Sequence, residues 1–161
     1  MELLVIGGGG REHAIIRKIK ESPLCGTASC ARGNGGISAD AICCPEVKAT
    51  DIEGAVKLAK EKNVDFVIVA PDDPLAAGMV DALEEAGIPA FGPKKNAAVI
   101  EGSKAFAKDL MKKYGIPTAD YEVFTDAEKA IAYLKEKNSY PAVIKGDGLA
   151  LGKGVVIGLH E

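Results

Sequence analysis

Through the first part of the chain, short apolar segments alternate with longer segments that carry apolar residues at helical spacing. The segments 3–6 and 65–70 are largely apolar and rich in β-branched residues, as is typical of strands buried on both faces of a sheet. Between them, the segment 11–21 places Ala14, Ile15, Ile16 and Ile19 on one helical face. Parallel strands need such a crossover, so this order predicts an α/β domain with a parallel sheet and helices on both faces.

The other elements predicted in the first part of the chain continue the alternation of strands and helices. We expect strands at 25–31, 41–44 and 89–91, and helices at 51–62 and 75–86. Asp51 is the expected N-cap of the helix 51–62, because its side-chain oxygen can accept a backbone N–H. The buried face of that helix is predicted to hold Ile52, Ala55, Val56 and Ala59.

The pattern changes after Gly92 and Pro93. Helices are predicted at 103–114 and 126–137, and strands at 121–124, 142–145 and 155–158. The last two strands flank a glycine-rich loop, so they predict a hairpin. We therefore expect a first domain over 1–101 and the start of a second over 102–161. A hairpin with an uncovered edge at the end of the chain indicates that the second domain is truncated.

Composition excludes several classes of partner. The net charge is -3, aromatic residues make up 5% of the chain, and Trp is absent. Neither a basic surface for nucleic acid nor an aromatic platform for stacking bases is therefore expected. No stretch reaches the ~20 apolar residues that span a bilayer, and the apolar start is too short for a signal peptide. We expect a cytoplasmic protein that binds neither nucleic acid nor membranes.

The chain has four cysteines, at positions 25, 30, 43 and 44. Zinc or disulfides could use them, but their spacing matches no common zinc pattern and no His lies near them. Reduced, buried thiols are the expected state, and no metal site is predicted within the chain.

Glycines at positions 7–10 separate the first strand from the first helix. Such a loop lets backbone N–H groups approach an anion, and the helix N-terminus favours negative charge by about 0.3–1 kcal/mol. A dinucleotide fingerprint is opposed because its third small position falls on Glu12 or His13, and because Arg32 lies where an acidic residue is expected. A smaller phosphate ligand, held by the loop and Arg11, is favoured over NAD, NADP or a plain turn.

Two further loops follow predicted strands on the edge where open parallel sheets bind ligands. Asp72 and Asp73 follow the strand 65–70, and Gly33-Asn34-Gly35 follows the strand 25–31. The aspartates can hydrogen-bond a hydroxyl or an amine, while a cap of the next helix is the alternative for Asp73. Three loops are therefore expected to converge on one site.

The segment 145–154 is a glycine-rich loop between two predicted strands, with lysines near both of its ends. Its spacing departs from that of a P-loop, and no helix follows it. A plain hairpin turn is the alternative, but a turn needs fewer glycines. We interpret the segment as a flap that closes over nucleotide phosphates, with Lys145 and Lys153 supplying positive charge.

Three stretches resemble the phosphoribosylamine–glycine ligase family. They are Gly8-Gly-Gly-Arg-Glu-His-Ala14, Phe91-Gly-Pro with Glu101-Gly-Ser-Lys-Ala-Phe-Ala-Lys108 and Gly115-Ile-Pro-Thr118, and 143–156, which is similar to the family pattern K-A-D-G-L-A-x-G-K-G-V. The resemblance covers essentially the whole chain in order. Gly146 replaces the usual Ala, and Asp72 stands where the family's G-P-E-x-P-L has Glu.

The resemblance implies a Rossmann-like pre-ATP-grasp domain followed by the first part of an ATP-grasp domain. It also implies a ligase of purine biosynthesis that joins glycine to 5-phosphoribosylamine through glycyl phosphate, using ATP and Mg²⁺. The positions matching the family's substrate site are Gly8, Gly9, Gly10, Arg11, Asn34, Asp72 and Pro74. Those matching its ATP site are Lys104, Lys145, Asp147, Gly148, Gly152, Lys153 and Gly154. The metal ligands are expected beyond Glu161 and no catalytic residue within the chain, so the chain alone is predicted to be inactive.

Two other classes stay open at this point. One is another ATP-grasp carboxylate–amine ligase, and the other is a non-catalytic nucleotide-binding module. The runs Arg11-Glu-His13 and Asp147-Gly-Leu-Ala150 favour the glycine ligase.

Overall fold

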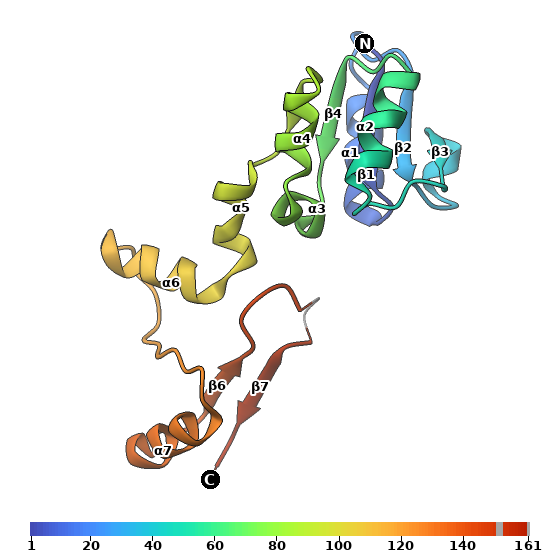
Figure 1. Cartoon of the computed structure of the whole chain (residues 1–161). Coiled ribbons are helices and arrows are strands. Elements are labelled where there is room, and N and C mark those ends of the chain that lie inside the picture. Colours follow the sequence, from blue (N-terminus) through green and yellow to red (C-terminus); the bar gives the residue numbers. More distant parts are fainter. Residues whose placement is uncertain (151–152, 161) are drawn as a thin grey trace. The chain divides into compact units, whose positions relative to one another are not determined.

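A computed structural model describes residues 1–150 and 153–160 of the chain. Backbone contacts divide the chain into two units, Met1–Val99 and Ile100–Glu161. In Figure 1 the first unit runs from blue to green, and the second from yellow to red.

A five-stranded parallel sheet organises the first unit, with the strand order β3-β2-β1-β4-β5 (Figure 1). The strands are β1 (Leu3–Gly7), β2 (Ala28–Arg32), β3 (Ile42–Cys44), β4 (Phe66–Val69) and β5 (Ala90–Phe91). Central strand β1 pairs on both sides, since Leu3 lies opposite Ala28 and opposite Phe66. The strand order therefore reverses between β1 and β4, which is where open α/β sheets form ligand crevices at their carboxyl ends.

Helices cover both faces of this sheet. They are α1 (Gly10–Ile19), α2 (Ile52–Glu61), α3 (Asp72–Ala77) and α4 (Met79–Glu85), with the 3₁₀ turn η1 (Ile37–Ala39). Leu4 and Ile6 belong to one buried apolar cluster with Leu58 of α2, whereas Val5 belongs to a second with Ile16 of α1. Successive side chains of a strand point to opposite faces, so both faces of β1 are packed. The predicted α/β fold with a parallel sheet is confirmed.

Two helices of this unit differ from the prediction. Helix α1 ends at Ile19, and Ala14 is exposed, while Glu12 is buried although it is charged. The predicted helix 75–86 is wrong in outline, because Gly78 adopts a left-handed conformation (φ +99°) that separates α3 from α4. Glycine tolerates this conformation because it has no Cβ. Asp51, in contrast, caps α2 as predicted, accepting the backbone N–H of Gly54 at 2.9 Å.

The cysteines are free thiols within the first unit. Cys30 and Cys44 are buried as predicted, whereas Cys25 and Cys43 are only half-buried. Burial raises the pKa of the Cys30 thiol to about 12, which keeps it protonated at neutral pH.

The second unit contains two helices and a two-stranded sheet. These are α6 (Lys104–Lys113), α7 (Ala127–Lys137) and the antiparallel strands β6 (Ala142–Lys145) and β7 (Val155–Gly158). The hairpin and both helices match the prediction within a residue or two at their ends. Helix α5 (Lys95–Gly102), which the sequence patterns do not predict, precedes α6.

The segment 121–124 forms no strand, contrary to the prediction. Its side chains are instead held by neighbouring helices of the second unit. Tyr121 donates a hydrogen bond to Asp109 Oδ1 at 2.6 Å, and the rings of Phe124 and Tyr133 lie 5.2 Å apart. These contacts replace the strand partner that the segment lacks among the described residues.

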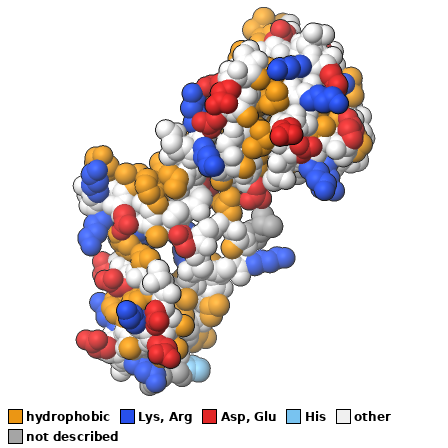
Figure 2. Space-filling view, viewed as in Figure 1, with side chains coloured by type: hydrophobic (Ala, Val, Ile, Leu, Met, Phe, Trp, Pro, Cys, Tyr) orange, Lys and Arg blue, Asp and Glu red, His pale blue; other side chains and the backbone are white. Residues whose placement is uncertain are grey.

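Burial differs sharply between the two units. Among the described residues, none after Ala98 is buried. In β6 and β7, consecutive residues are exposed, including Val143, Ile144, Val156 and Ile157, so both faces of the hairpin meet solvent. Figure 2 shows orange hydrophobic side chains at the surface of this unit. Within the described part of the chain, no helix is both long and apolar enough to cross a membrane.

Candidate functional site

Three loops meet at the carboxyl edge of the first unit's sheet. They follow β1, β2 and β4, and hydrogen bonds join them, including one from the Gly33 N–H to the Gly7 carbonyl at 3.1 Å. Asn34 Nδ2 donates to the carbonyl of Gly8 at 2.8 Å, and Arg11 Nη1 donates to the carbonyl of Ala70 at 3.1 Å. The glycine loop is therefore held to its neighbours on both sides.

Arg11 and Asp72 face one another across the point where the strand order reverses. Their side chains approach to 3.6 Å, and they are 61% and 45% exposed. Such an exposed pair contributes little to stability, because water screens it. Both groups are accessible to a ligand, the guanidinium as a donor for an anion and the carboxylate as an acceptor for hydroxyl or amine protons.

The Asn34 side chain shapes the second loop. Its Oδ1 accepts the backbone N–H groups of Gly36 at 2.8 Å and Ile37 at 2.9 Å, while its Nδ2 is bonded to Gly8. Because one amide group makes three internal bonds, Asn34 fixes the spacing between the first and second loops. Only its remaining Nδ2 hydrogen is left for a ligand.

Close packing explains why the first loop needs glycine at position 8. A Cβ atom added there would lie 2.7 Å from the carbonyl oxygen of Gly33, which is too close for real atoms. Gly10 differs, since a Cβ there would meet nothing within 4 Å. The two backbones can therefore approach only because position 8 has no side chain.

Two residues that the sequence analysis did not place in the site lie next to it, in the first turns of α1. Buried Glu12 accepts the backbone N–H of Gly9, so this N–H is already satisfied. His13 Nε2 lies 2.8 Å from Asp40 Oδ2, and this hydrogen bond is the largest cause that lowers the pKa of Asp40. A Glu at the third helical position is a capping signal that could have identified Glu12.

The remaining predicted residues of this site are also located. Asp72 and Asp73 both lie in the first turn of α3, whose N-cap is Pro71, so Asp73 is not the cap. Pro74 is almost completely buried, less than 2% exposed. Any contribution of Pro74 to binding is therefore through the shape of the loop.

A second candidate site lies within the second unit, around the glycine-rich loop. The backbone N–H of Gly146 donates to the carbonyl of Gly154 at 2.8 Å, which extends the hairpin beyond its last strand pair. Lys104 Nζ donates to the carbonyl of Gly148 at 2.7 Å, and Asp147 bonds to the start of α6. Lys104, Asp147 and Gly148 are thus brought together although more than forty residues separate Lys104 from the other two.

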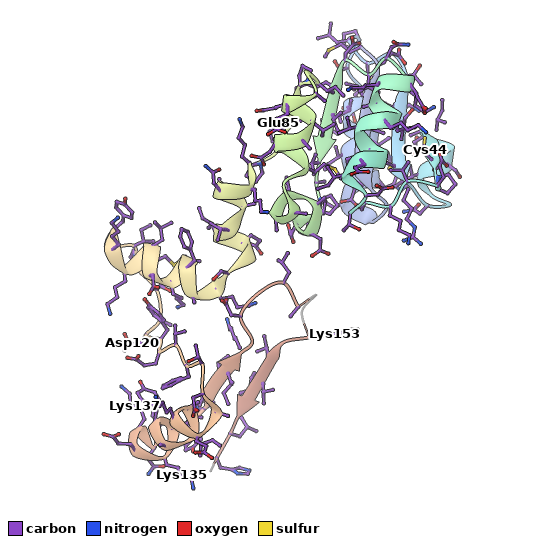
Figure 3. All side chains as sticks on the ribbon, viewed as in Figure 1. Cys44, Glu85, Asp120, Lys135, Lys137 and Lys153 are labelled. Carbon is purple, nitrogen blue, oxygen red and sulfur yellow. The ribbon has the colours of Figure 1, made fainter. Side chains whose placement is uncertain are left out.

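The two other lysines of this site are exposed to solvent. Lys145 lies at the end of β6, opposite Val155. Lys153 precedes β7, where Figure 3 labels it. Gly152 lies outside the described residues. The exposed ammonium groups can therefore donate to an anionic ligand, such as a phosphate group.

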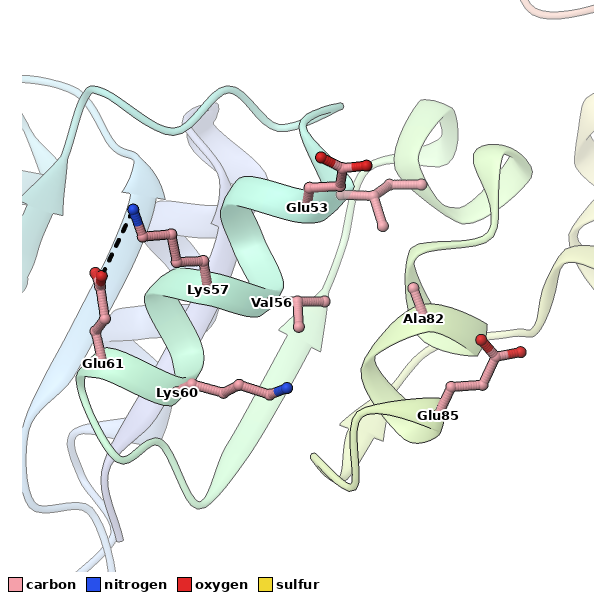
Figure 4. A pocket seen from close by; sticks show the side chains of 8 residues that line it. Glu53, Val56, Lys57, Lys60, Glu61, Ala82 and Glu85 are labelled. Atoms are coloured by element: carbon pink, nitrogen blue, oxygen red, sulfur yellow. Dashed lines mark ion pairs between the residues drawn. The ribbon is translucent and has the colours of Figure 1, made fainter.

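A shallow groove of about 480 Å³ lies elsewhere in the first unit, between α2 and α4 (Figure 4). Ile52, Val56 and Ala82 contribute apolar surface, and the ion pair of Lys57 and Glu61 lies at one side. The eight residues that line it include none of the predicted site residues. The loop cluster at the sheet edge has the charged and backbone groups that a phosphate ligand needs, whereas this groove is mainly apolar.

No group of three or more His, Cys, Asp or Glu side chains that could hold a metal ion occurs within the described residues.

Comparison with known proteins identifies matches to both units. The family model for the phosphoribosylglycinamide synthetase N domain matches residues 1–101, and that for the ATP-grasp (A) domain of the same family matches residues 102–161. A phosphoribosylamine–glycine ligase from Listeria monocytogenes is 55% identical over 160 residues, which cover 99% of this chain and 38% of that protein. The chain therefore spans well under half the length of this relative.

Solved structures also match the chain over almost its whole length. The crystal structure of a phosphoribosylamine–glycine ligase from Thermotoga maritima is 35% identical with a TM-score of 0.77, covering 100% of this chain and 36% of that one. The biotin carboxylase domain of the 2-oxoglutarate carboxylase from Hydrogenobacter thermophilus, in complex with MgADP, ADP and bicarbonate, is 26% identical with a TM-score of 0.75. The match covers 99% of this chain and 37% of that one.

Proposed function

The chain belongs to the phosphoribosylglycinamide synthetase family, and from this premise we propose that it supplies the N-terminal part of a phosphoribosylamine–glycine ligase. The reaction joins glycine to 5-phosphoribosylamine with ATP, through glycyl phosphate, and yields glycinamide ribonucleotide, ADP and phosphate. The consecutive match of two domains of one family, in order along the chain, is the observation that carries this proposal. We propose 1–101 and 102–161 as the corresponding domains.

The loop cluster of the first unit is the proposed site for the phosphoribosyl substrate. The glycine loop at 8–10 begins helix α1, whose free N–H groups and dipole favour a phosphate. Arg11 can add a charge-assisted hydrogen bond, and the Asp72 carboxylate can accept from ribose hydroxyls or the amine. Asn34 holds the first two loops together through its bond to the Gly8 carbonyl.

The glycine-rich loop of the second unit is the proposed nucleotide flap. Lys104 and Lys145 are the proposed donors to ATP phosphates, with Gly148, Lys153 and Gly154 on the flap. Gly152, outside the described residues, is included from the sequence alone. The likeness to a biotin carboxylase domain solved with MgADP supports nucleotide binding by the complete protein.

Magnesium would supply charge stabilisation to the transferring phosphoryl group. We propose that its ligands, and the catalytic residues, lie beyond residue 161. The chain alone is therefore proposed to have no ligase activity, and the complete protein is proposed to act in the cytoplasm.

Another carboxylate–amine ligase of the ATP-grasp type is the second candidate, because the carboxylase domain is nearly as similar in fold. The 55% identity to a phosphoribosylamine–glycine ligase favours the first candidate over it. A non-catalytic module has no comparable support.

Calorimetric titration of the full-length gene product tests the proposal. Glycinamide ribonucleotide and ATP should each bind, whereas NADP should not. A phosphate-release assay with ATP, glycine and 5-phosphoribosylamine should show turnover that depends on all three. Turnover with a different amine or carboxylate, and none with these, would favour the second candidate.

A further inference from the structure

The carboxylate of Asp147 lies at the N-terminus of helix α6, although the two are far apart in the sequence. Its Oδ1 accepts the backbone N–H groups of Lys104 at 2.6 Å and Ala105 at 3.3 Å. Its Oδ2 accepts the hydroxyl of Ser103 at 3.0 Å. Both carboxylate oxygens are therefore used by the helix.

These bonds complete the start of the helix. The first N–H groups of any helix have no partner within it. In α6 the Ser103 hydroxyl oxygen accepts the N–H of Phe106, and Asp147 accepts the two N–H groups before it. The backbone N–H of Ala105 and the hydroxyl of Ser103 hold the pKa of Asp147 below its usual value, so the cap is ionised at neutral pH.

The same contact positions the side chain of Lys104. Its ammonium group donates to the carbonyl of Gly148 at 2.7 Å and is partly buried. The backbone N–H of Lys104 is bonded to Asp147, and the side chain of Lys104 is bonded to Gly148. A long, flexible side chain that normally samples many rotamers is thereby restricted to one region.

The described residues of the second unit provide no buried core that could hold the loop against α6. None of the described residues of the second unit is buried, so no apolar core fixes this loop. Polar bonds, and not a buried apolar core, therefore hold residues 147 and 148 against the start of α6.

We propose that Asp147 is a positioning residue for nucleotide binding, which acts by holding Lys104 and Gly148 together rather than by contacting the nucleotide. This inference rests on the proposed function of the loop. A carboxylate repels phosphate groups, and the two oxygens of Asp147 already face N–H and O–H donors. Direct contact between Asp147 and the phosphates is therefore disfavoured, whereas an effect transmitted through Lys104 follows from the geometry.

A double-mutant cycle tests this inference in the full-length gene product, with ATP as the titrated ligand. Lys104→Ala should weaken ATP binding about tenfold, because it removes the charge-assisted contact between Lys104 and ATP. Asp147→Ala should have a similar effect, because Lys104 is then no longer held in place for that contact. The double variant should be no more than about twofold weaker than Lys104→Ala alone, because the two residues act as one unit. Asp120→Ala, which removes an exposed carboxylate from the same unit, is the matched control and should leave affinity unchanged.

A conservative variant and hydrogen exchange separate positioning from loss of fold. Asp147→Asn keeps one acceptor oxygen without the charge, and should restore part of the affinity that Asp147→Ala loses. If Asp147→Ala does not fold, the cycle is run with Asp147→Asn. The amides of Lys104 and Ala105 should exchange faster in either variant, while those of α7 should not.

The outcomes distinguish this inference from the proposed function. If Lys104→Ala weakens binding but the Asp147 loss adds to it in full, or if Asp147→Ala has no effect, the positioning role is overturned and the nucleotide site stands. If Lys104→Ala leaves ATP affinity unchanged, the assignment of Lys104 to the nucleotide site fails, and this inference fails with it.

Discussion

The interactions that stabilise the first unit differ from those that stabilise the second. The first unit buries both faces of its sheet, with Leu4 and Val5 of β1 almost fully inaccessible on opposite sides. The second has no buried residue among those described, and its hairpin exposes apolar side chains on both faces. A two-stranded sheet is at best marginally stable by itself, whereas a sheet covered by helices on both faces has its own core. Independent stability therefore depends on complete layers and not on the number of apolar residues.

In the second unit, hydrogen bonds between polar groups replace apolar burial as the contacts that fix local structure. Lys108 Nζ donates to Thr118 Oγ1 at 2.6 Å and to the carbonyl of Ala119 at 2.8 Å, which ties the segment after α6 back to that helix. Together with the Asp147 cap, such bonds fix local geometry. They contribute less to stability than apolar burial, because water competes for each group. The first unit should accordingly be the more stable of the two.

The largest expected effect concerns the core of the first unit. Leu4→Ala should destabilise that unit by about 2–5 kcal/mol, because it leaves a cavity beneath a fully buried strand. Val156→Ala in β7 should change stability by less than about 0.5 kcal/mol, because Val156 is 63% exposed. Native-state hydrogen exchange of β1 and β6 amides measures each unit separately. Equal losses for the two substitutions would contradict the contrast between the units.

The next effect concerns the proposed nucleotide site of the second unit. Lys145→Ala in the full-length gene product should weaken ATP binding about ten- to a hundredfold, through loss of a charged contact of about 1.5–3 kcal/mol. Lys135→Ala, an exposed lysine of α7, is the control (Figure 3). Calorimetry should show the loss for ATP but not for glycinamide ribonucleotide. Unchanged ATP affinity would remove Lys145 from the site.

A somewhat smaller effect is expected at the proposed substrate loops of the first unit. Gly8→Ala places a Cβ 2.7 Å from the Gly33 carbonyl oxygen, so the two loops must separate. At a cost of about 1–2 kcal/mol, glycinamide ribonucleotide should bind roughly five- to thirtyfold more weakly. Glu53→Ala, at an exposed position of α2 outside these loops, is the control and should bind normally. Equal losses for ATP and the ribonucleotide would indicate general misfolding instead.

The smallest expected effect concerns the pKa values of two carboxyl groups, one in each unit. Hydrogen bonds lower the folded-state pKa of Asp40 in the first unit and of Asp147 in the second from the usual 3.8. The stability that each contributes is therefore complete above about that pH, and is lost as the pH falls through the lower folded-state value. NMR titration of the side-chain carbonyls measures both pKa values. His13→Ala should raise only that of Asp40, and Ser103→Ala only that of Asp147.

Much of the first unit could be predicted from sequence because its signals are local. The apolar run of β1, the glycines after it and the cap at Asp51 each indicate their own conformation. The convergence of three loops follows from the parallel order of the strands. Helix α5 was not predicted, because its residues have little periodicity, and the break at Gly78 looks like an ordinary glycine within a helical pattern.

Other errors arise from interactions between distant residues. The segment 121–124 has strand-like composition, but a strand also needs a partner, and Tyr121 bonds to Asp109 of α6 instead. Likewise, sequence reasoning identified Asn34 as a ligand contact, whereas its three internal bonds appear only when the loops are assembled. The capping role of Asp147 could not be predicted for the same reason. Its sequence neighbourhood indicates a flap, and its helix-capping bonds depend on residues near position 104.

The central position of β1 also has a consequence for biosynthesis. β1 is the first strand to be made, yet one of its two neighbours, β4, begins only at Phe66. At about 5–20 residues per second, a nascent chain carries an unpaired β1 edge for roughly 3–13 s. During this interval a strand that is buried along its whole length in the folded domain is open to pairing with another chain. Shielding of this strand until β4 has been made should therefore reduce aggregation during synthesis.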